Sequence, residues 1–305
     1  MTINIHAKQL LAFTTIYELQ SFTQAAKHLN ITQPTLSNQI RMLEQALGVT
    51  LFDRTTRNLA ITDIGKMVLE NAYLVLNTLK RIEDNIHLNR QGIVGHVRVG
   101  AILSAYAIVL PPVVQRFSEK YPNIKVELVE ASADEIHPML NTNKIDIAIC
   151  DQNFECDGYS YQHLYYDDLM LVCHEQHPLA NKAQCHFDDI NQLPFITMSG
   201  NTNIRPLTEK YFLSNGSKLQ PVFNAEFQST TLSLIKQNLG VSILPKSTIQ
   251  LMNCDGVSFI PISDPIMHNS IGLLSAAPKP AFNTATVNFI NEIDNFIKMK
   301  ANKLL

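Results

Sequence analysis

This 305-residue sequence has few of the features that mark secreted or membrane-spanning proteins. It has five cysteines, an odd number without CxxC spacing, which indicates reduced thiols rather than a disulfide framework. It has no charged-then-apolar segment at its start and no apolar run of membrane-spanning length. We therefore expect a cytoplasmic protein without a membrane partner.

The sequence motifs of common enzymes are also missing. There is no GxSxG, no HExxH, no phosphate-binding loop and no dinucleotide-binding fingerprint. Isolated His and Asp residues occur in any chain and do not define a catalytic centre by themselves. We expect no catalytic residues, no cofactor and no enzymatic activity.

Charge is sparse and unevenly distributed. Charged residues make up 17% of the chain against 46% hydrophobic ones, which is typical of globular proteins, and the length predicts two or three folding units. Residues 1–91 carry 9 basic and 7 acidic residues, whereas residues 92–305 carry 15 and 20. Only the N-terminal part is basic, which favours a nucleic-acid partner for that part of the chain.

Residues 21–61 carry the most specific pattern in the chain, two short amphipathic helices joined by a tight turn and followed by a basic hairpin. Ser21 caps the first helix, and Gln24 completes a capping box. Thr32 caps the second helix, with Pro34 tolerated in its first turn. Pro34 either shapes this helix start alone or also touches a thymine methyl group.

The second helix has two contrasting faces. Apolar residues at spacings of four, three and four share its buried face, namely Leu36, Ile40, Leu43 and Leu47. The opposite face is dense in hydrogen-bonding groups, which suits the major groove, where Gln and Asn pair with adenine. Two arginines of the hairpin would lie along the sugar-phosphate backbone. The predicted DNA contacts are Thr32, Gln33, Pro34, Thr35, Ser37, Asn38, Arg41, Arg54 and Arg57. We interpret this stretch as a DNA-binding winged helix-turn-helix.

More than a dozen positions of this stretch stand at fixed offsets: Ser21-Phe22-Thr23, Ala25-Ala26, Leu29, Thr32-Gln33-Pro34, Leu36-Ser37, Gln39-Ile40, Leu43-Glu44, Leu47-Gly48, Leu51-Phe52, Arg54 and residues 62–65. With them the chain resembles the N-terminal domain of LysR-type transcriptional regulators. That family usually has Arg or Lys after Ser37, whereas this chain has Asn38. The departure weakens the expectation of a phosphate or guanine contact there and favours adenine readout.

Residues 62–91 predict one long linker helix that Gly92 ends. An apolar seam with nearly heptad spacing runs along it: Ile64, Val68, Ala72, Val75, Leu79, Ile82 and Ile86. Such a seam favours a partner helix over a globular core, although a single long core helix is the alternative. We assign dimerisation to Ile64, Val68, Val75, Leu79, Ile82 and Ile86. The resemblance implies a dimer, and a tetramer formed as a dimer of dimers.

Strands and helices alternate from residue 92 onward, which predicts an α/β domain. Strands are expected at 96–103, 124–131, 144–150, 194–198, 221–227, 241–245 and 271–276, and helices at 106–120, 134–142, 202–214, 229–238 and 281–298. The Pro111-Pro112 pair is awkward inside its helix unless it marks a kink or a fresh start. Two similar lobes joined by crossover strands near 163–172 and 262–270 resemble the two-lobed, periplasmic-binding-protein-like (type II) effector domain of the LysR family.

The expected domain limits follow from these elements. Residues 1–61 form the winged helix-turn-helix, 62–91 the linker and dimerisation helix, and 92–305 the effector-binding domain. Lobe I covers about 92–163 and 268–305, and lobe II about 164–267.

A small molecule is expected between the lobes, near the carboxyl ends of the strands. The residues placed there are Ile102, Leu103, Ser104, Cys150, Asp151, Met198, Ser199, Gly200, Asn201, Phe227, Gln228 and Ser229. Ser104, Ser199 and Ser229 either cap helices or donate to a ligand. Free N–H groups at helix starts slightly favour an anion, whereas Asp134, Glu135 and Asp151, which outnumber Arg205, favour a cationic amine.

Two other site chemistries are weaker alternatives. The residues Cys173, His174, His177, Cys185 and His186 include zinc-ligand types, but their spacing fits no standard site, so no metal is expected. Cys150 and Cys156 would form a redox pair, but the neighbouring acids Asp151, Glu155 and Asp157 disfavour the thiolate that sensing needs.

We conclude that the sequence predicts a sequence-specific DNA-binding transcriptional regulator controlled by a small-molecule effector. Its partners would be double-stranded DNA, the effector and further copies of itself, with RNA polymerase as an additional partner. The alternatives are a thiol-based redox-sensing regulator and, in a different class, a solute-binding or catalytic α/β protein with an accessory helical domain.

Overall fold

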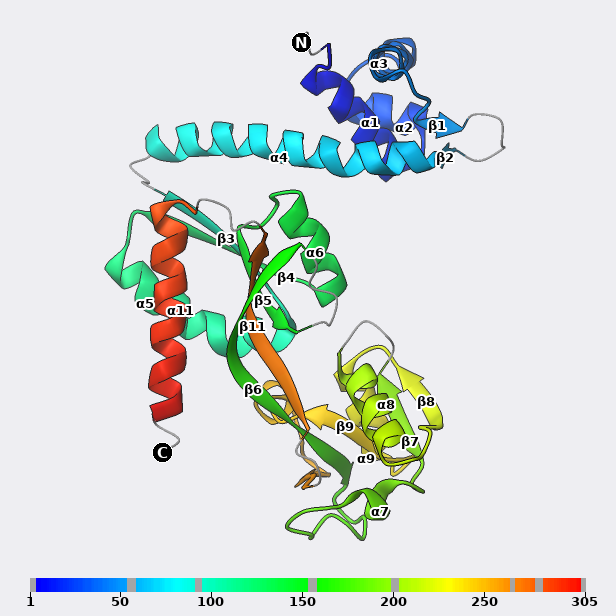
Figure 1. Cartoon of the computed structure of the whole chain (residues 1–305), viewed down its shortest axis with the longest axis vertical. Coiled ribbons are helices and arrows are strands. Elements are labelled where there is room, and N and C mark those ends of the chain that lie inside the picture. The colour runs from blue at the N-terminus through cyan, green and yellow to red at the C-terminus, as the bar shows by residue number, and fades with distance from the viewer. Residues whose placement is uncertain are drawn as a thin grey trace. The chain divides into compact units, whose positions relative to one another are not determined.

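The computed structural model describes residues 4–53, 59–90, 95–152, 158–198, 203–263, 267–277 and 282–302. These residues form two compact units, residues 1–94 with 138–144 and residues 95–137 with 145–305. Figure 1 labels the helices and strands of each unit.

The N-terminal unit begins with three short helices, α1 (Ala7–Leu19), α2 (Phe22–His28) and α3 (Gln33–Leu47). The sequence pattern did not predict α1. The two predicted caps are confirmed, because the hydroxyls of Ser21 and Thr32 accept from backbone N–H groups at 3.3 Å each. Gly48 ends α3 in a left-handed conformation (φ 70°), which a residue without Cβ adopts freely.

The three helices enclose a small apolar core. Leu36, Ile40 and Leu43 of α3 are fully buried, as their spacing predicted. Phe13 of α1 packs edge-on against Phe52, with ring centroids 5.3 Å apart. Phe52 belongs to β1 (Phe52–Asp53), which pairs antiparallel with β2 (Ala60–Ile61). The predicted wing contacts Arg54 and Arg57 lie between these strands, outside the described residues.

A single helix, α4 (Asp63–Arg90, 28 residues), follows the wing. The first turn of α4 packs on the hairpin segment at Gly65. No side chain fits at this position, because a Cβ there would lie 2.5 Å from the Leu51 carbonyl oxygen. Leu69 and Ala72 of α4 join the core of the helix-turn-helix. Among the helices in the described ranges, α4 included, none is both long enough and apolar enough to cross a membrane.

The C-terminal unit is an α/β domain of two lobes. In lobe I, β3 (Gly95–Ala101) lies parallel to β4 (Ile124–Glu130) and to β5 (Ile147–Asp151). Two long antiparallel strands, β6 (Tyr159–His174) and β11 (His268–Ala276), extend between lobe I and lobe II (Figure 1). In lobe II, β6 pairs with β9 (Ser242–Pro245) and β10 (Val257–Pro261), and β7 (Phe195–Met198) pairs in parallel with β8 (Pro221–Ala225).

Helices cover both lobes. Lobe I carries α5 (Leu110–Lys120), α6 (Ala133–Asn141) and α11 (Thr284–Asn302). Lobe II carries α7 (Phe187–Ile190), α8 (Ile204–Ser214), α9 (Gln228–Lys236) and α10 (Thr248–Leu251). The sequence pattern predicted neither β10 nor the four-residue helices α7 and α10. The two-lobed α/β fold itself is the predicted one.

The proline pair does not mark a fresh helix start, because the chain stays helical without a break over residues 103–120. A π-helical turn, Ala105–Val109, precedes α5, which begins at Leu110. Pro111 and Pro112 thus follow directly on a π-helical turn, an irregularity of the kind that accompanies proline inside a helix.

Candidate functional site

The outer face of α3 is a row of polar side chains that contact one another. Gln33 donates from Nε2 to Ser37 Oγ at 3.2 Å, one helical turn apart. Arg41 donates from Nη2 to Asn38 Oδ1 at 2.7 Å. These contacts hold the side chains in defined orientations before any ligand arrives, which lowers the entropy lost on binding.

The face is open and free of acidic groups. Thr32, Gln33, Pro34, Thr35, Asn38 and Arg41 are exposed, and Ser37 is half-buried. Glu44 is the only acidic residue of α3, and its Oε1 accepts from the Leu51 N–H at 2.8 Å, at the approach to the hairpin. Glu44 thus links the end of α3 to the segment before the hairpin. The outer face of α3 presents donors and neutral acceptors suited to base edges and phosphates.

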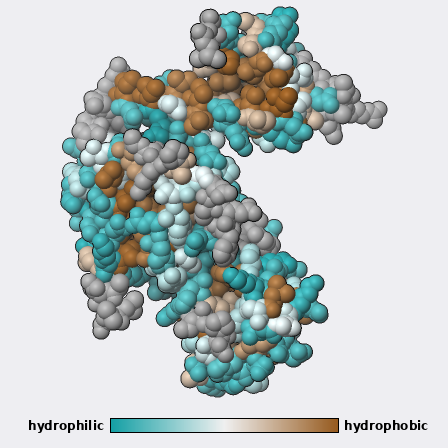
Figure 2. All heavy atoms as spheres, in the orientation of Figure 1, coloured by the Kyte–Doolittle hydropathy of each residue, from teal (hydrophilic) through white to brown (hydrophobic). Residues whose placement is uncertain are grey.

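The apolar seam of α4 is largely exposed in a single chain. Leu79, Ile82 and Ile86 are 41%, 53% and 51% exposed, which is high for such large side chains. Ile64 and Val75 are exposed as well, whereas Val68 packs beside the helix-turn-helix core. Figure 2 shows apolar side chains gathered along α4 and the helices packed on it.

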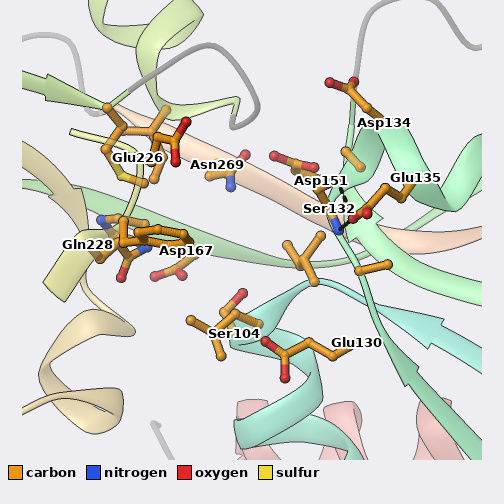
Figure 3. Close-up of a pocket in the computed structure, with 18 residues that line it drawn as sticks. Ser104, Glu130, Ser132, Asp134, Glu135, Asp151, Asp167, Glu226, Gln228 and Asn269 are labelled. Carbon is orange, nitrogen blue, oxygen red and sulfur yellow. Dashed lines mark hydrogen bonds between the residues drawn. The ribbon is translucent and has the colours of Figure 1, made fainter. Parts of the chain in front are cut away.

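A cavity of about 760 Å³ lies between the two lobes of the C-terminal unit. This volume is in the range of small-molecule sites. Its lining combines apolar and polar groups: Ile102, Leu103, Ser104, Glu130, Ala131, Ser132, Ala133, Asp134, Glu135, Asp151, Asp167, Met198, Ile204, Glu226, Phe227, Gln228, Pro245 and Asn269. Figure 3 shows the polar side chains arranged around this space.

The structure brings seven of the sequence-predicted residues to this cavity: Ile102, Leu103, Ser104, Asp151, Met198, Phe227 and Gln228. It does not bring Cys150 there, because adjacent residues of a strand point to opposite faces and Cys150 is buried behind Asp151. Ser229 is exposed outside the lining, since it lies one step around α9 from Gln228. Ser199, Gly200 and Asn201 lie outside the described residues.

Sequence reasoning missed several lining residues. The rule that ligands bind at the carboxyl ends of strands would have found Glu130, the last residue of β4, and Glu226, directly after β8. No such rule finds Asp167 or Asn269, because both stand within the long strands β6 and β11. Ser104 makes no capping hydrogen bond and is instead hydrogen-bonded to the Tyr165 side chain.

The lining is strongly acidic. Six of its residues carry carboxylates, namely Glu130, Asp134, Glu135, Asp151, Asp167 and Glu226, and none of the described lining residues is Lys, Arg or His. Arg205, the base expected at the rim, is not part of the lining and donates from Nε to Glu209 Oε1 at 2.9 Å. The described lining therefore favours the cationic alternative over the anion that the sequence slightly favoured.

Two of these carboxylates are buried. Asp151 is 7% exposed, and burial raises its pKa against the opposing effect of hydrogen bonds from its own N–H, the Asn203 N–H and the Asn269 side chain. Its Oδ1 has no hydrogen-bond partner among the described residues. Burial also raises the pKa of Asp167, whose Oδ1 accepts from the Ser247 N–H at 3.1 Å.

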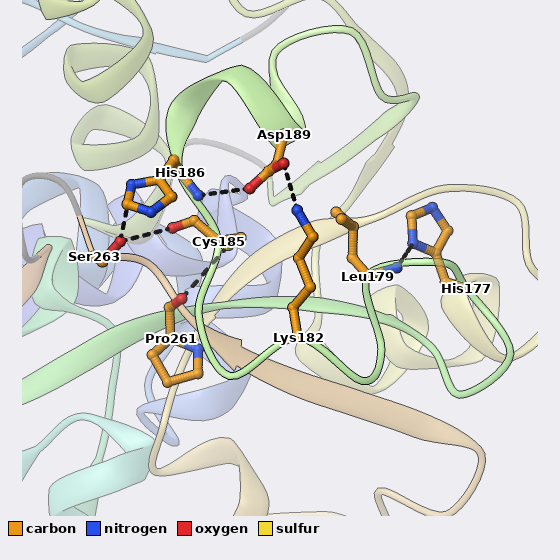
Figure 4. Close-up of polar contacts among 8 residues, drawn as sticks. All are labelled: His177, Leu179, Lys182, Cys185, His186, Asp189, Pro261 and Ser263. Carbon is orange, nitrogen blue, oxygen red and sulfur yellow. Dashed lines mark hydrogen bonds and ion pairs between the residues drawn. The ribbon is translucent and has the colours of Figure 1, made fainter.

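The cysteine- and histidine-rich loop of lobe II has structural contacts (Figure 4). His177 Nδ1 accepts from the Leu179 N–H at 3.2 Å, and Cys185 Sγ donates to the Pro261 carbonyl at 3.5 Å. His186 caps α7. Burial raises the pKa of both Cys173 and Cys185 to about 11, so both thiols remain protonated near neutral pH.

A helix-turn-helix with an open polar face, joined to a two-lobed domain around a cavity, defines a regulator with separate DNA-reading and ligand-binding parts. Two family models match the chain, the "Bacterial regulatory helix-turn-helix protein, lysR family" model over residues 7–66 and the "LysR substrate binding domain" model over residues 90–292. The chain belongs to the LysR family of transcriptional regulators, as the sequence resemblance predicted.

Individual relatives agree with this assignment. The chain is 30% identical to the uncharacterized HTH-type transcriptional regulator YbhD of Escherichia coli, over 86% of this chain and 83% of the relative. It is 25% identical to a hydrogen peroxide-inducible genes activator of Haemophilus influenzae, over 92% and 93%. The crystal structure of CbnR, a LysR family transcriptional regulator, has the same fold, with a TM-score of 0.73, 21% identity and coverage of 96% and 99%.

Proposed function

We propose that this LysR-family regulator binds double-stranded DNA through the outer face of α3 and responds to a small organic effector in the interlobe cavity. The observation that carries the DNA assignment is the prearranged polar row on α3, where Gln33 and Asn38 offer amide groups for base edges and Arg41 offers a charge for phosphate. CbnR, which shares the fold, has been crystallised with its target DNA, which supports the same use of this domain.

We propose that Thr32, Pro34, Thr35 and Ser37 complete this interface, with Arg54 and Arg57 on the DNA backbone. The corresponding domains are residues 1–61 for DNA binding, 62–91 for dimerisation and 92–305 for effector binding. Binding to promoter DNA places the protein in the cytoplasm, where RNA polymerase is a natural further partner. We assign the chain no catalytic role.

The proposed assembly is a dimer through α4. Its exposed seam would be covered by a second copy, and two paired helices would carry two DNA-reading domains to a dyad-symmetric site. Each half-site contact is weak alone, so pairing supplies the affinity that a specific operator requires. A dimer of dimers would extend this arrangement.

The effector site rests on the interlobe cavity, which is lined by residues of both lobes. A ligand that contacts both lobes stabilises the arrangement of the lobes to which it binds more tightly. The resulting shift in population is the signal that a regulator transmits. We place Ile102, Ser104, Asp151, Met198 and Gln228 at this site, together with the further lining residues above.

A gel-shift assay tests the DNA-binding proposal. The full chain is titrated onto a fragment from upstream of its own gene and onto a scrambled fragment of the same length. We expect retardation of the upstream fragment at protein concentrations at which the scrambled fragment stays free. Equal retardation of both fragments would reject sequence-specific binding.

Thiol-based redox sensing is the second candidate, because several relatives are named as hydrogen peroxide-inducible genes activators. The buried, protonated thiols of Cys173 and Cys185 do not support it, and Cys156 lies outside the described residues. A Cys156→Ser variant decides the matter. If peroxide changes DNA binding of the wild type and not of this variant, the redox candidate is correct.

A further inference from the structure

The carboxylates of the cavity do not all play the same part. Glu135 Oε2 accepts from both the N–H and the hydroxyl of Ser132, at 2.9 and 2.7 Å, and so caps the start of α6. Asp151, Asp167 and Glu226 instead point toward the common space from three different strands or strand ends (Figure 3). Three convergent carboxylates create a strongly negative potential at the centre of the cavity.

Asp151 provides the most specific indication of what fills this space. It is almost fully buried, and its Oδ1 lacks a hydrogen-bond partner within the described residues. A buried carboxylate oxygen without a partner is costly, and native proteins normally satisfy such a group. An N–H donor of a ligand would supply such a partner, and a positively charged donor would also offset the buried charge.

The surrounding groups indicate an organic ligand rather than a metal ion. The described residues contain no group of three or more His, Cys, Asp or Glu side chains placed to hold a metal. Ile102, Met198, Ile204 and Phe227 line the same cavity and would pack on a hydrocarbon body. The volume of about 760 Å³ also far exceeds that of a single ion.

We propose that the effector of this regulator is an organic cation, an amine or guanidine, whose charged group donates to Asp151 Oδ1. This inference rests on the proposed effector site. A second donor of the ligand would reach Asp167 or Glu226, so that one molecule joins Asp151 of lobe I to Glu226 of lobe II. Binding would therefore favour a defined arrangement of the two lobes, which is the change that a regulator passes to DNA.

Probes of equal length and different charge test the proposal on the full-length protein. Calorimetry at neutral pH would compare 1,4-diaminobutane and its mono-guanidine analogue with the neutral 1,4-butanediol and the anionic succinate. We expect binding of at least one of the two cations and of neither the diol nor succinate. Binding of succinate alone would overturn the cation while leaving an effector site in place, and no binding of either cation would also overturn it.

Variants locate the bound cation. Asp151→Asn and the exposed Glu226→Gln should each raise its Kd about tenfold or more, the effect of losing one charge-assisted hydrogen bond. Asp168→Asn is the matched control, because Asp168 neighbours Asp167 in β6 but lies outside the cavity lining and contacts His268. Unchanged Kd values in both cavity variants would overturn the placement. If the gel shift detects no specific DNA binding while calorimetry still detects cation binding, the proposed DNA-binding function is rejected and this inference is not.

Discussion

Arg41 donates from Nη2 to Asn38 Oδ1 at 2.7 Å on the exposed face of α3. LysR-type regulators usually carry a basic residue at the position of Asn38. In this chain the nearby positive charge belongs to Arg41, about one turn further along the same helix. Asn38 keeps its amide hydrogens on the same face, where Nδ2 donates to the Met42 sulfur at 3.8 Å. In the proposed interface this pair would combine a base-reading amide with a phosphate-binding guanidinium.

Arg41→Ala should weaken binding to all DNA sequences alike and lower the slope of log K against log salt concentration by about one unit. The reason is that a phosphate contact releases counterions without reading a base. Titrations at several salt concentrations measure this slope. Lys8→Ala, on α1, is a control for the loss of one positive charge elsewhere in the same domain. An unchanged slope in the Arg41 variant would remove Arg41 from the interface.

Gln33→Ala should reduce operator affinity by about 1–3 kcal/mol and relax selectivity at one base pair. Its amide is exposed and held by Ser37, so the loss concerns base readout and not folding. Binding to a library of single-base operator variants measures both effects. Wild-type affinity together with wild-type selectivity would show that α3 does not use Gln33.

Leu79→Asp should separate the dimer and abolish operator binding at the same time. The substitution places a carboxylate in the apolar seam. Burying this charge against the α4 of a second chain would cost roughly several kcal/mol of desolvation free energy unless the carboxyl becomes neutral. Sedimentation and gel shift on the same preparation test the prediction. Asn71→Asp introduces the same charge at an exposed site on α4 outside the seam and should leave the oligomer intact. A Leu79→Asp protein that sediments like the wild type would argue against the α4 dimer.

Asp151→Asn should stabilise the ligand-free protein at neutral pH. Because burial raises the pKa of Asp151 in the folded state, ionisation of this carboxyl lowers the free energy of unfolding. This loss of stability is absent below the ordinary pKa of 3.8 and complete above the raised pKa. The amide can keep the accepting oxygen and place its nitrogen where Oδ1 now lacks a partner. We expect Tm to rise by about 2–4 °C, corresponding to about 1 kcal/mol. The gain should shrink as the pH falls toward 3.8, so a pH-independent gain would contradict the charge argument.

Binding of an organic cation should strengthen as the pH rises through the raised pKa values of Asp151 and Asp167. Below those values the carboxyls are protonated, and the cation must displace protons to bind. Asp134 adds to the rise for Asp151. Asp168 adds to the rise for Asp167, while Lys300 opposes it. Calorimetry of 1,4-diaminobutane in buffers of different ionisation enthalpy should detect proton release. Absence of linked protons and of any pH dependence would contradict this coupling.

The sequence by itself determined the elements that depend on near neighbours. The caps at Ser21 and Thr32 and the buried face of α3 all follow from contacts within a few residues along the chain. Such contacts are set by local backbone geometry, so residue type and spacing suffice to predict them.

The tertiary structure alone decided the character of the cavity. Asp167 and Asn269 lie within long strands, and they reach the cavity only because β6 and β11 run between the lobes. The strand-end rule places Asp151 at the cleft and would also place Glu226 there, but only the packing of the two lobes shows that their carboxylates face the same space. The loss of solvent around Asp151, which raises its pKa and leaves Oδ1 without a partner, arises only when distant segments pack around it.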